Sequence, residues 1–540
     1  MTIRFTNADR RQMKALGVSA ARVVEQIETF RRSDSLVGLD RPCTIGDGVR
    51  KIDDSDVHKY TALHASAAGR DRFMKFVPAS GAATRMFQSL LQIYYLPQYL
   101  ERDELQIRLA QGVSIACDFK RFVDRLHEFP FVHSLSQVLA DDGYDLDDLR
   151  RDGPFQILLE YLLTDIGLGY GCLPKAMLLF HSYPEEQRTA FEEQLAESAM
   201  YLGTKGGKCS VHFTVPEEHE AGFLKLKDIA CRRCSDRHAR DFDVSFSFQK
   251  HSTNTIAVDM NGSPFRDRFG RLHFRPAGHG ALIENLSDLH ADLIYIKNVD
   301  NVVPDRLKET VSFWKKVLGG CLVSIQEKTH SFLRLMHGPD AGQTVLEAAD
   351  FASRELLSSF PDGFKMWPVD KRRSFLIKLL DRPIRVCGVV PNSGEPGGAP
   401  FWVKGENGEV SIQIVEKAQV DLNSPGQNAI WNSSTHFNPV DIVCCTRDFE
   451  GNPFDLKKFV DPKAVIISRK SKDTSDIQAL ELPGLWNGGM ADWITLMIEV
   501  PPATFNPVKS VYDLLRPEHQ PERTCASAGP CAVSPSHHLF

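Results

Sequence analysis

The stretch Phe73-Met-Lys-Phe-Val-Pro-Ala-Ser-Gly-Ala-Ala-Thr-Arg-Met86 decides the fold class of this chain. An apolar run ends in a turn of small residues, and from Met86 to Tyr94 apolar residues recur at helical spacing. A strand that opens into such a loop before a helix presents unpaired backbone N–H groups, which favour a phosphate. Arg85 adds a planar guanidinium that suits phosphate oxygens. The alternative is an ordinary tight turn between a strand and a helix.

Strand and helix patterns alternate after this stretch. Strand patterns cover residues 210–215, 243–249, 255–259 and 292–297, and helical patterns cover 186–202 and 280–289. Asn261-Gly262 is typical of a hairpin turn after the third of these strands. Such alternation predicts an α/β fold with a mainly parallel sheet, whose ligands bind at the carboxyl ends of the strands.

Composition excludes several classes of protein. The chain has 540 residues, 42% of them hydrophobic and 25% charged, and its net charge of −6 argues against a nucleic-acid partner. No apolar core of a signal peptide stands at the start, and no apolar run is long enough to cross a bilayer. The 12 cysteines are scattered, and Cys231 and Cys234, which are expected in a charged loop, lack the further ligands of a zinc site. We expect a cytoplasmic protein that binds neither nucleic acid nor membranes.

The chain divides into five predicted segments. Residues 1–70 are expected to be helical, with Ser19 as the cap of one helix. Residues 71–304 and 381–521 are expected to form the two parts of one α/β core. Between them, 305–380 has helical periodicity and is expected to be an insertion. Residues 522–540 have the composition of a disordered tail.

Polar residues suited to a multiply charged phosphate follow these patterns. Asp300 comes after the 292–297 strand, where one carboxylate can hold Mg²⁺ while phosphates and water complete its ligands, although such turns also occur without metal. Lys175 and Lys470 are cations that a phosphate would need, but most single lysines are solvated surface charges. Gly278 and Gly280 flank His279, so they either let a flat ligand approach the backbone or simply form a turn.

The order of these motifs resembles the eukaryote-type UDP-sugar pyrophosphorylases, including UDP-N-acetylhexosamine pyrophosphorylases. The loop 80–85 is similar to their Gly-rich Gly-Thr-Arg loop, Pro174-Lys175 to their Pro-Lys-Gly, and Val299-Asp300-Asn301 to their Val-Asp-Asn. Weaker similarities lie at 248–249, 276–280, 414–416, 468–470 and 505–509. Residues 76–86 and 483–490 also resemble a bacterial family known only as a domain of unknown function, over about residues 70–520.

The resemblance implies a GT-A-like (Rossmann-like) α/β nucleotidyltransferase sandwich. It also implies a reaction in which a sugar 1-phosphate attacks the α-phosphorus of a nucleoside triphosphate, with UTP favoured, and expels pyrophosphate. Such transfer depends on positioning and charge neutralisation. The expected cofactor is Mg²⁺, and the expected partners are the triphosphate and the sugar 1-phosphate.

The resemblance also implies a role for each matching residue. Those expected at the triphosphate are Ser80, Gly81, Ala82 and Thr84, with Arg85 at the leaving pyrophosphate. Lys175 would touch the phosphates or the incoming sugar phosphate, and Lys470 would neutralise the latter. The residues expected to face the nucleobase are Gln249, Gly278, His279 and Gly280. Asp300 would hold Mg²⁺, and Glu416 and Asn438 would reach the sugar.

Two departures from that family keep other functions open. Ala82 and Ala83 stand where the family favours glycine, and His279 replaces its Asn or Gly. One alternative is a nucleotide-binding protein without turnover. Another is a GT-A glycosyltransferase, although Val299-Asp300-Asn301 lacks the second carboxylate of an Asp-x-Asp metal site.

Overall fold

The chain forms two compact units in a computed structural model that describes residues 4–31, 36–203, 207–338, 342–394, 397–405, 408–472 and 475–521. The first unit comprises residues 1–84, 172–178 and 190–507, and the second comprises 85–171, 179–189 and 508–540. These boundaries differ from the five predicted segments. The tail expected at 522–540 lies outside the described residues.

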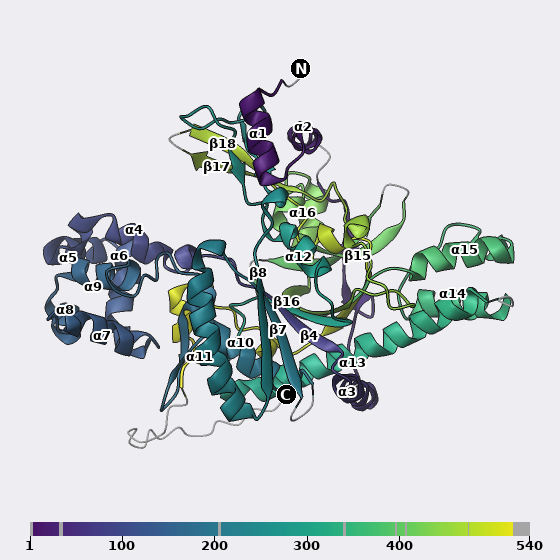
Figure 1. The fold of residues 1–540 in the computed structure, drawn as a ribbon, viewed down its shortest axis with the longest axis horizontal. Coiled ribbons are helices and arrows are strands. Elements are labelled where there is room, and N and C mark those ends of the chain that lie inside the picture. The colour runs from purple at the N-terminus through teal and green to yellow at the C-terminus, as the bar shows by residue number, and fades with distance from the viewer. Residues whose placement is uncertain are drawn as a thin grey trace, which may run out of the picture. The chain divides into compact units, whose positions relative to one another are not determined.

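A nine-stranded sheet is the centre of the first unit (Figure 1). Its strands, in spatial order, are β2 (Thr44–Ile45), β3 (Gly48–Arg50), β19 (Ile494–Glu499), β13 (Ile384–Pro391), β16 (His436–Cys445), β12 (Leu293–Lys297), β4 (Phe73–Pro78), β7 (Lys208–Thr214) and β8 (Asp241–Ser247). Only β16 is antiparallel to its neighbours. The mixed, mainly parallel sheet predicted from the sequence is therefore confirmed, as is the strand that the apolar run from Phe73 predicts.

Four adjacent parallel strands place the predicted loops at one edge of this sheet. Strands β12, β4, β7 and β8 lie side by side in that order and run in the same direction. Their carboxyl ends lead into the segments that begin at 298, 79, 215 and 248. The candidate residues of the 80–84 loop, Asp300 and Gln249 therefore start from the same edge.

Helix α13 (Asp305–Met336) belongs to the packing of this sheet. It contacts α3 (Asp54–Ala68), β13 and β16, and its far end contacts α14 (Gly342–Arg354) and α15 (Val369–Leu380) (Figure 1). Gly320 makes the close approach to α3 possible, because a Cβ there would collide with the backbone carbonyl of Tyr60. The helices expected at 305–380 are present, and the first of them covers the core rather than standing apart from it.

Smaller sheets complete the first unit. β1 (Leu39–Pro42), β14 (Gly398–Lys404) and β15 (Val410–Glu416) form one three-stranded sheet, and β10 (Val258–Asp259), β18 (Ser475–Glu481) and β17 (Ile466–Lys472) form another. β9 (Thr255–Ile256) pairs with β11 (Phe274–Arg275), and α16 (Pro425–Asn432) contacts β1. The turn at 261–262 joins a short hairpin, as predicted, because Val258 and Pro264 form an antiparallel bridge and the Asp259 N–H donates to the Ser263 carbonyl oxygen at 2.8 Å.

The N-terminal segment is only partly helical. Ser19 caps α2 (Ala20–Thr29) by accepting a hydrogen bond from the Arg22 backbone N–H, as predicted. α2 and α1 (Asn7–Leu16) bury Met13, Val23 and Ile27 against β9 and β10. Residues 39–50, however, form strands β1, β2 and β3, so the prediction of helices throughout 1–70 is wrong there. Those strands are very short, and so the sequence pattern has almost no period to reveal them.

Three other sequence-based expectations are corrected. The helix expected at 186–202 is α10 (Ala190–Ser198), since 187–189 form a strand. The helix expected at 280–289 is α12 (Ile283–Ser287) after a 3₁₀ turn. Cys231 and Cys234 lie on α11 (Glu220–His238) rather than in a loop. None of the helices described is long and apolar enough to cross a membrane.

The second unit is mainly helical. Its helices are α4 (Gln88–Tyr94), α5 (Arg102–Ala110), α6 (Ser114–Asp124), α7 (Val132–Asp141), α8 (Leu146–Asp152) and α9 (Phe155–Leu163). β5 (Leu179–Ser182) and β6 (Gln187–Thr189) form its two-stranded sheet. The residues just after Gly81 form only a 3₁₀ turn, Ala83–Arg85, and α4 begins at Gln88. The α-helix expected from Met86 thus begins two residues later and lies in the second unit.

His212 on β7 provides a test of the buried sheet. Its two ring nitrogens lie 2.8 Å from the hydroxyls of Ser245 and Ser247, and burial lowers its pKa to about 4. Because the folded pKa lies below the unfolded value, we expect His212 to stabilise the fold above about pH 6.5 and this contribution to be lost toward pH 4, by about 1.4 kcal/mol per pH unit. Urea unfolding across this range should show a shallower pH dependence in His212→Gln. An unchanged slope would contradict the assignment.

Candidate functional site

The loop after β4 is held by the segment that contains Lys175. The Ala83 N–H donates to the Leu173 carbonyl oxygen at 3.0 Å, and the Lys175 N–H donates to the Gly81 carbonyl oxygen at 3.2 Å. Gly81, Ala82 and Thr84 are exposed, Ser80 is half-buried and Ala83 is buried. The loop therefore presents an accessible surface, but one of the N–H groups expected to be open to a phosphate is already bonded.

Lys175 and Asp300 form an ion pair at the edge of the sheet. The Lys175 Nζ lies 2.8 Å from Asp300 Oδ2, and the two side chains are only 13% and 9% exposed. The two residues are 125 positions apart in sequence. The structure thus brings together a predicted phosphate-binding cation and the predicted metal ligand, beside the loop that was expected to hold the triphosphate.

The turn that carries Asp300 is fixed on one side by Asn301. The Asn301 Oδ1 accepts from the Asn506 backbone N–H at 2.9 Å, and its Nδ2 donates to the Thr504 carbonyl oxygen at 3.4 Å. Both ends of this amide are therefore engaged by the backbone of 504–506. These two hydrogen bonds fix the turn that carries Asp300.

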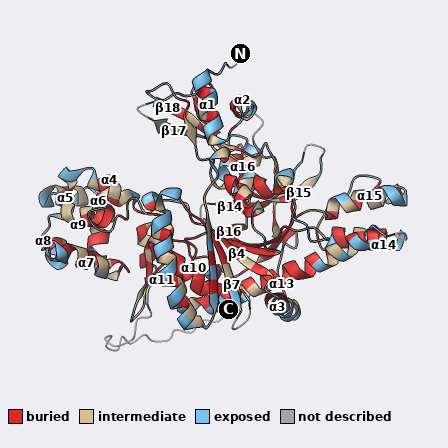
Figure 2. Cartoon of the chain, viewed as in Figure 1, coloured by how far each residue is buried: buried red, intermediate tan, exposed pale blue. Residues whose placement is uncertain are grey.

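Helix α10 fixes the same turn on the other side. Gln194 Nε2 donates to the carbonyl oxygens of Asn298 at 2.9 Å and Val299 at 3.2 Å. Every residue of α10 is buried, although the helix contains three glutamates (Figure 2). The polar side chains of α10 therefore bond to groups inside the protein. Their burial was not expected from the sequence.

Glu197 on α10 lies in a buried cluster of charged side chains, some of which come from the central sheet. Its carboxylate oxygens lie 3.0 Å from Lys75 Nζ on β4 and 2.7 Å from Lys297 Nζ on β12. Lys315 on α13 pairs with Asp441 on β16, and all five side chains are at most 2% exposed. Burial lowers the pKa of Lys75 to about 7 against the opposing charge of Glu197. The cluster joins three neighbouring strands directly below the turn that carries Asp300.

A second group of predicted residues gathers around His279. Its Nδ1 accepts from the Leu485 backbone N–H at 3.0 Å, and its ring stacks on Trp486 with centroids 4.2 Å apart. Gly280 is required there because a Cβ would collide with the Pro483 carbonyl oxygen. Gly278 has a φ of +73°, which favours glycine. The flat surface of His279 and Trp486 is the kind of platform on which a base stacks.

Glu416 belongs to the same group. Its Oε1 lies 3.7 Å from His279 Nε2 and 2.8 Å from Asn487 Nδ2. Burial raises the pKa of Glu416, but the nearby imidazole of His279 and the hydrogen bond from Asn487 outweigh burial, so the net pKa lies below its usual value. A residue predicted at the nucleobase and one predicted at the sugar are thus neighbours. Asn487 and Trp486 were missed, although the Gly484–Gly489 segment that holds them is conspicuous in the sequence.

The other candidate residues are not brought into these two groups by the bonds that the structure shows. Gln249 follows β8 and donates to Thr253 Oγ1 at 3.4 Å. Asn438 is 2% exposed, with its Nδ2 bonded to the Gly388 carbonyl oxygen and its Oδ1 to the Val440 N–H, so its amide is engaged within the sheet. Lys470 is exposed on β17, in a different sheet from β12. Arg85 is exposed and is the first residue of the second unit.

The residues at Asp300 suit one kind of metal site. Within the described ranges, no three His, Cys, Asp or Glu side chains gather as metal ligands, which does not match a closed zinc site. A single carboxylate beside a phosphate-binding loop matches the way proteins bind Mg²⁺, through one or two carboxylates plus substrate phosphates and water. Asp300 fits that requirement if its carboxylate binds Mg²⁺ together with Lys175 or after Lys175 has moved away from it.

The chain belongs to the family described as a domain of unknown function, DUF4301, which matches residues 6–520. This confirms the bacterial family expected from residues 76–86 and 483–490. None of the curated proteins matches the chain.

Several solved pyrophosphorylases are similar to the chain as a whole. The UDP-glucose pyrophosphorylase of Leishmania major has 12% identity and a TM-score of 0.41, with 95% of this chain and 79% of that chain covered. The uridine diphosphate N-acetylglucosamine pyrophosphorylase of Trypanosoma brucei has 11% identity and a TM-score of 0.45, with 94% and 79% covered. Identities this low do not establish a shared activity, so the function has to be argued from the site itself.

Proposed function

We propose that the protein transfers a nucleotidyl group from a nucleoside triphosphate, with UTP favoured, to a sugar 1-phosphate. The observation that carries this proposal is the ion pair of Lys175 and Asp300, held beside the exposed 80–84 loop at the carboxyl ends of β4 and β12. Ligands of parallel α/β sheets bind at that edge. A cation, a carboxylate and an accessible small-residue loop are the groups that a triphosphate requires.

In the proposed reaction, an oxygen of the sugar 1-phosphate forms a bond to the α-phosphorus of the triphosphate. The bond between that phosphorus and the oxygen bridging to the β-phosphorus breaks, and pyrophosphate leaves with the electron pair. Lys175 binds phosphate oxygens, and the loop from Ser80 to Thr84 orients the triphosphate. Asp300 would hold Mg²⁺, which when bound neutralises charge on the phosphates. These residues act by positioning and by charge, and no covalent intermediate with the protein is needed.

The group around His279 supplies the recognition of the nucleotide sugar in this proposal. The ring of His279, supported by Trp486, stacks against the base, and Gln249 reads its edge. Glu416 accepts hydrogen bonds from sugar hydroxyls. Lys470 and Arg85 keep their predicted roles at the sugar phosphate and the pyrophosphate. The proposed location is the cytoplasm, where both substrates are made available as small soluble molecules.

One observation favours a second function, nucleotide binding without turnover. The Ala83 N–H is bonded to Leu173, so the loop offers fewer donors to a phosphate than a glycine-rich loop would. By contrast, the glycosyltransferase alternative gains no support, because Val299-Asp300-Asn301 has no second carboxylate and the amide of Asn301 is bonded to the backbone of 504–506.

Release of pyrophosphate distinguishes these functions. We expect the full chain with Mg²⁺ to release pyrophosphate only when both a triphosphate and a sugar 1-phosphate are present, and fastest with UTP. A panel of triphosphates and sugar 1-phosphates should be measured alongside binding of each triphosphate by thermal shift. Binding without release from any pair would replace the proposal with the non-catalytic function, and failure of all triphosphates to bind would contradict both.

Gly81 tests the role of the loop without disturbing the fold. A Cβ at Gly81 meets no atom within 4 Å, so Gly81→Ala should leave the melting temperature unchanged. In the complex, however, the added methyl group would obstruct the backbone where the phosphates approach, and we expect kcat/KM to fall about tenfold or more, equivalent to about 1.4 kcal/mol. Gly426→Ala, which also meets no atom within 4 Å, is the matched control. Equal activity of both variants would remove the loop from the site.

A further inference from the structure

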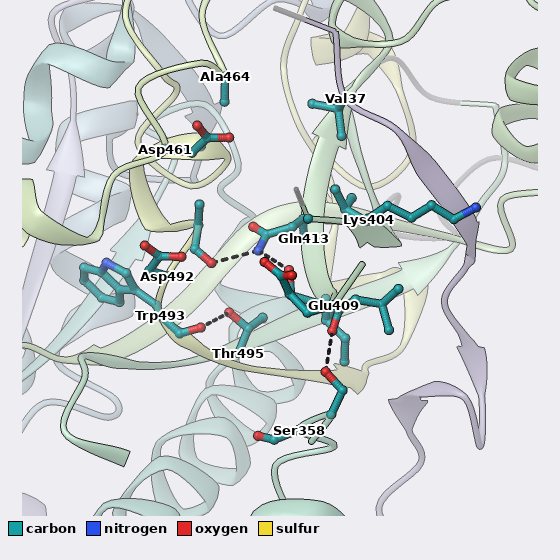
Figure 3. A pocket seen from close by; sticks show the side chains of 18 of the residues that line it. Val37, Ser358, Lys404, Glu409, Gln413, Asp461, Ala464, Asp492, Trp493 and Thr495 are labelled. Carbon is teal, nitrogen blue, oxygen red and sulfur yellow. Dashed lines mark hydrogen bonds between the residues drawn. The ribbon is translucent and has the colours of Figure 1, made fainter. Parts of the chain in front are cut away.

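A cavity of about 1170 Å³ lies at the other edge of the central sheet from Asp300 (Figure 3). Its lining includes Arg382, two residues before β13, and Trp493–Thr495, at the start of β19. Since β13 and β19 run in the same direction as β4 and β12, the starts of the former lie at the edge opposite the ends of the latter. None of the residues predicted for nucleotide, sugar or metal lines this cavity. Its size suits an organic ligand.

The guanidinium of Arg382 is the cation in this cavity that we consider as a binding group for a ligand. Its Nε donates to the Leu379 carbonyl oxygen at 2.7 Å. Among the described residues, no carboxylate oxygen lies within 4.0 Å of its guanidinium nitrogens. Burial lowers the pKa of Arg382, while the charge of Asp492 opposes that effect. Arg382 is half-buried, and a carboxylate or phosphate group can bind its guanidinium through two parallel hydrogen bonds.

Apolar side chains lead away from Arg382 along the cavity wall. Phe375 and Leu379 stand one turn apart on α15, on the helix that ends just before Arg382. The ring of Phe360 lies 6.0 Å from that of Phe375, and Ile412 and Ile414 of β15 are nearly fully buried in the lining. The cavity therefore joins the cation Arg382 to an extended apolar wall, and Lys404 and Lys463 are also in its lining.

Acidic side chains also line the cavity, and they favour the competing interpretation that the ligand is positively charged. Glu409, Asp461 and Asp492 are labelled in Figure 3 together with Gln413, whose Nε2 donates to the Ala491 carbonyl oxygen at 2.7 Å. Burial raises the pKa of Asp492, Arg382 lowers it, and the charges of Asp461 and Glu409 raise it further. These three carboxylates and that of Asp362, which also lines the cavity, would suit an amine. The charge of the ligand's head group is therefore what an experiment has to decide.

We propose that this cavity is a second ligand site, which binds an organic anion with a long apolar body. The carboxylate or phosphate head would bind the guanidinium of Arg382, and the body would pack along Phe375, Leu379 and Ile412. The site is separate from the proposed nucleotidyl transfer, because its residues and its edge of the sheet are different. Both a fatty carboxylate and an alkyl phosphate have this chemistry.

Titration calorimetry of the full chain tests the proposal with three probes of equal chain length: decanoate, decyl phosphate and decylamine, each below its micelle-forming concentration. We expect at least one of the two anions to bind and decylamine to bind at least tenfold more weakly; the stronger anion identifies the head group. Across octanoate, nonanoate and decanoate, the affinity should rise about fourfold per methylene. Arg382→Gln should weaken binding of the anion at least tenfold, and Arg382→Lys, which keeps the charge, less.

Arg373→Gln is the matched control, because Arg373 lies on α15, which ends just before Arg382, is outside the cavity and donates to the Gly338 carbonyl oxygen. It should leave the affinity unchanged. Preferential binding of decylamine would overturn the proposal in favour of the acidic wall. Absence of binding by both anions to the wild-type protein, or equal affinities of Arg382→Gln and Arg373→Gln, would also overturn it. Pyrophosphate release is measured in a separate experiment. Either proposal, the ligand site or the nucleotidyl transfer, can therefore be contradicted while the other stands.

Discussion

Asp300→Asn should reduce Mg²⁺-dependent turnover by a factor on the order of 10²–10³, the usual cost of removing one strong electrostatic contact in an active site. The substitution keeps the shape of the side chain but removes the charge that Mg²⁺ and Lys175 require. The fold should persist, because the turn is also held by Gln194 and Asn301. The measurement is pyrophosphate release as a function of Mg²⁺ concentration, with the melting temperature recorded for each variant.

Asp243→Asn provides the control for this change. Asp243 also pairs with a lysine, Lys208, at 2.9 Å, but both side chains are exposed and lie at the amino ends of their strands. We expect its turnover to match that of the wild-type protein. Unchanged turnover in Asp300→Asn, or an equal loss in both variants, would refute the assignment of Asp300.

Glu197→Ala should produce the largest loss of stability, about 3–5 kcal/mol of the free energy of unfolding. Its carboxylate is completely buried and pairs with both Lys75 and Lys297, so its removal leaves two buried ammonium groups without their partner. Urea unfolding at constant pH measures this difference. The turn of Asp300 follows Lys297 directly, so any activity that remains should be lower than in the wild-type protein.

Asp350→Ala is the matched control for stability. Asp350 pairs with Arg354 at 2.8 Å on α14, but both side chains are more than half exposed. Exposed pairs of this kind contribute about 0.5 kcal/mol or less. Similar losses in Glu197→Ala and Asp350→Ala would show that the buried cluster does not stabilise the sheet.

Strands β4 and β12 of the parallel sheet were predictable because they are largely apolar runs. The runs that begin near Phe73 and Leu293 are buried on both faces, and such segments stand out in any sequence. The ends of these strands were therefore predictable as well, and with them the positions of the 80–84 loop and Asp300. The pairing of Lys175 with Asp300 did not follow from periodicity, because it depends on backbone bonds between the 172–178 segment and the loop.

Other features could not be predicted because several charged residues, which usually lie on the surface, are buried in this protein. The glutamates of α10 and the lysines Lys75 and Lys315 look like surface charges in the sequence, yet they form the interior of the first unit. Asn438 shows the opposite error, since a polar residue expected at a ligand is bonded within the sheet at an irregular position of β16. The second unit was also missed, because three separate segments of the chain compose it.

The most direct test of the proposed function follows the α-phosphorus itself. With UTP labelled at that atom, a sugar 1-phosphate and Mg²⁺, we expect the label to appear in a nucleotide sugar, with one pyrophosphate released for each molecule formed. Label that stays in UTP, or that appears in UMP by hydrolysis, would contradict nucleotidyl transfer as the activity of this protein.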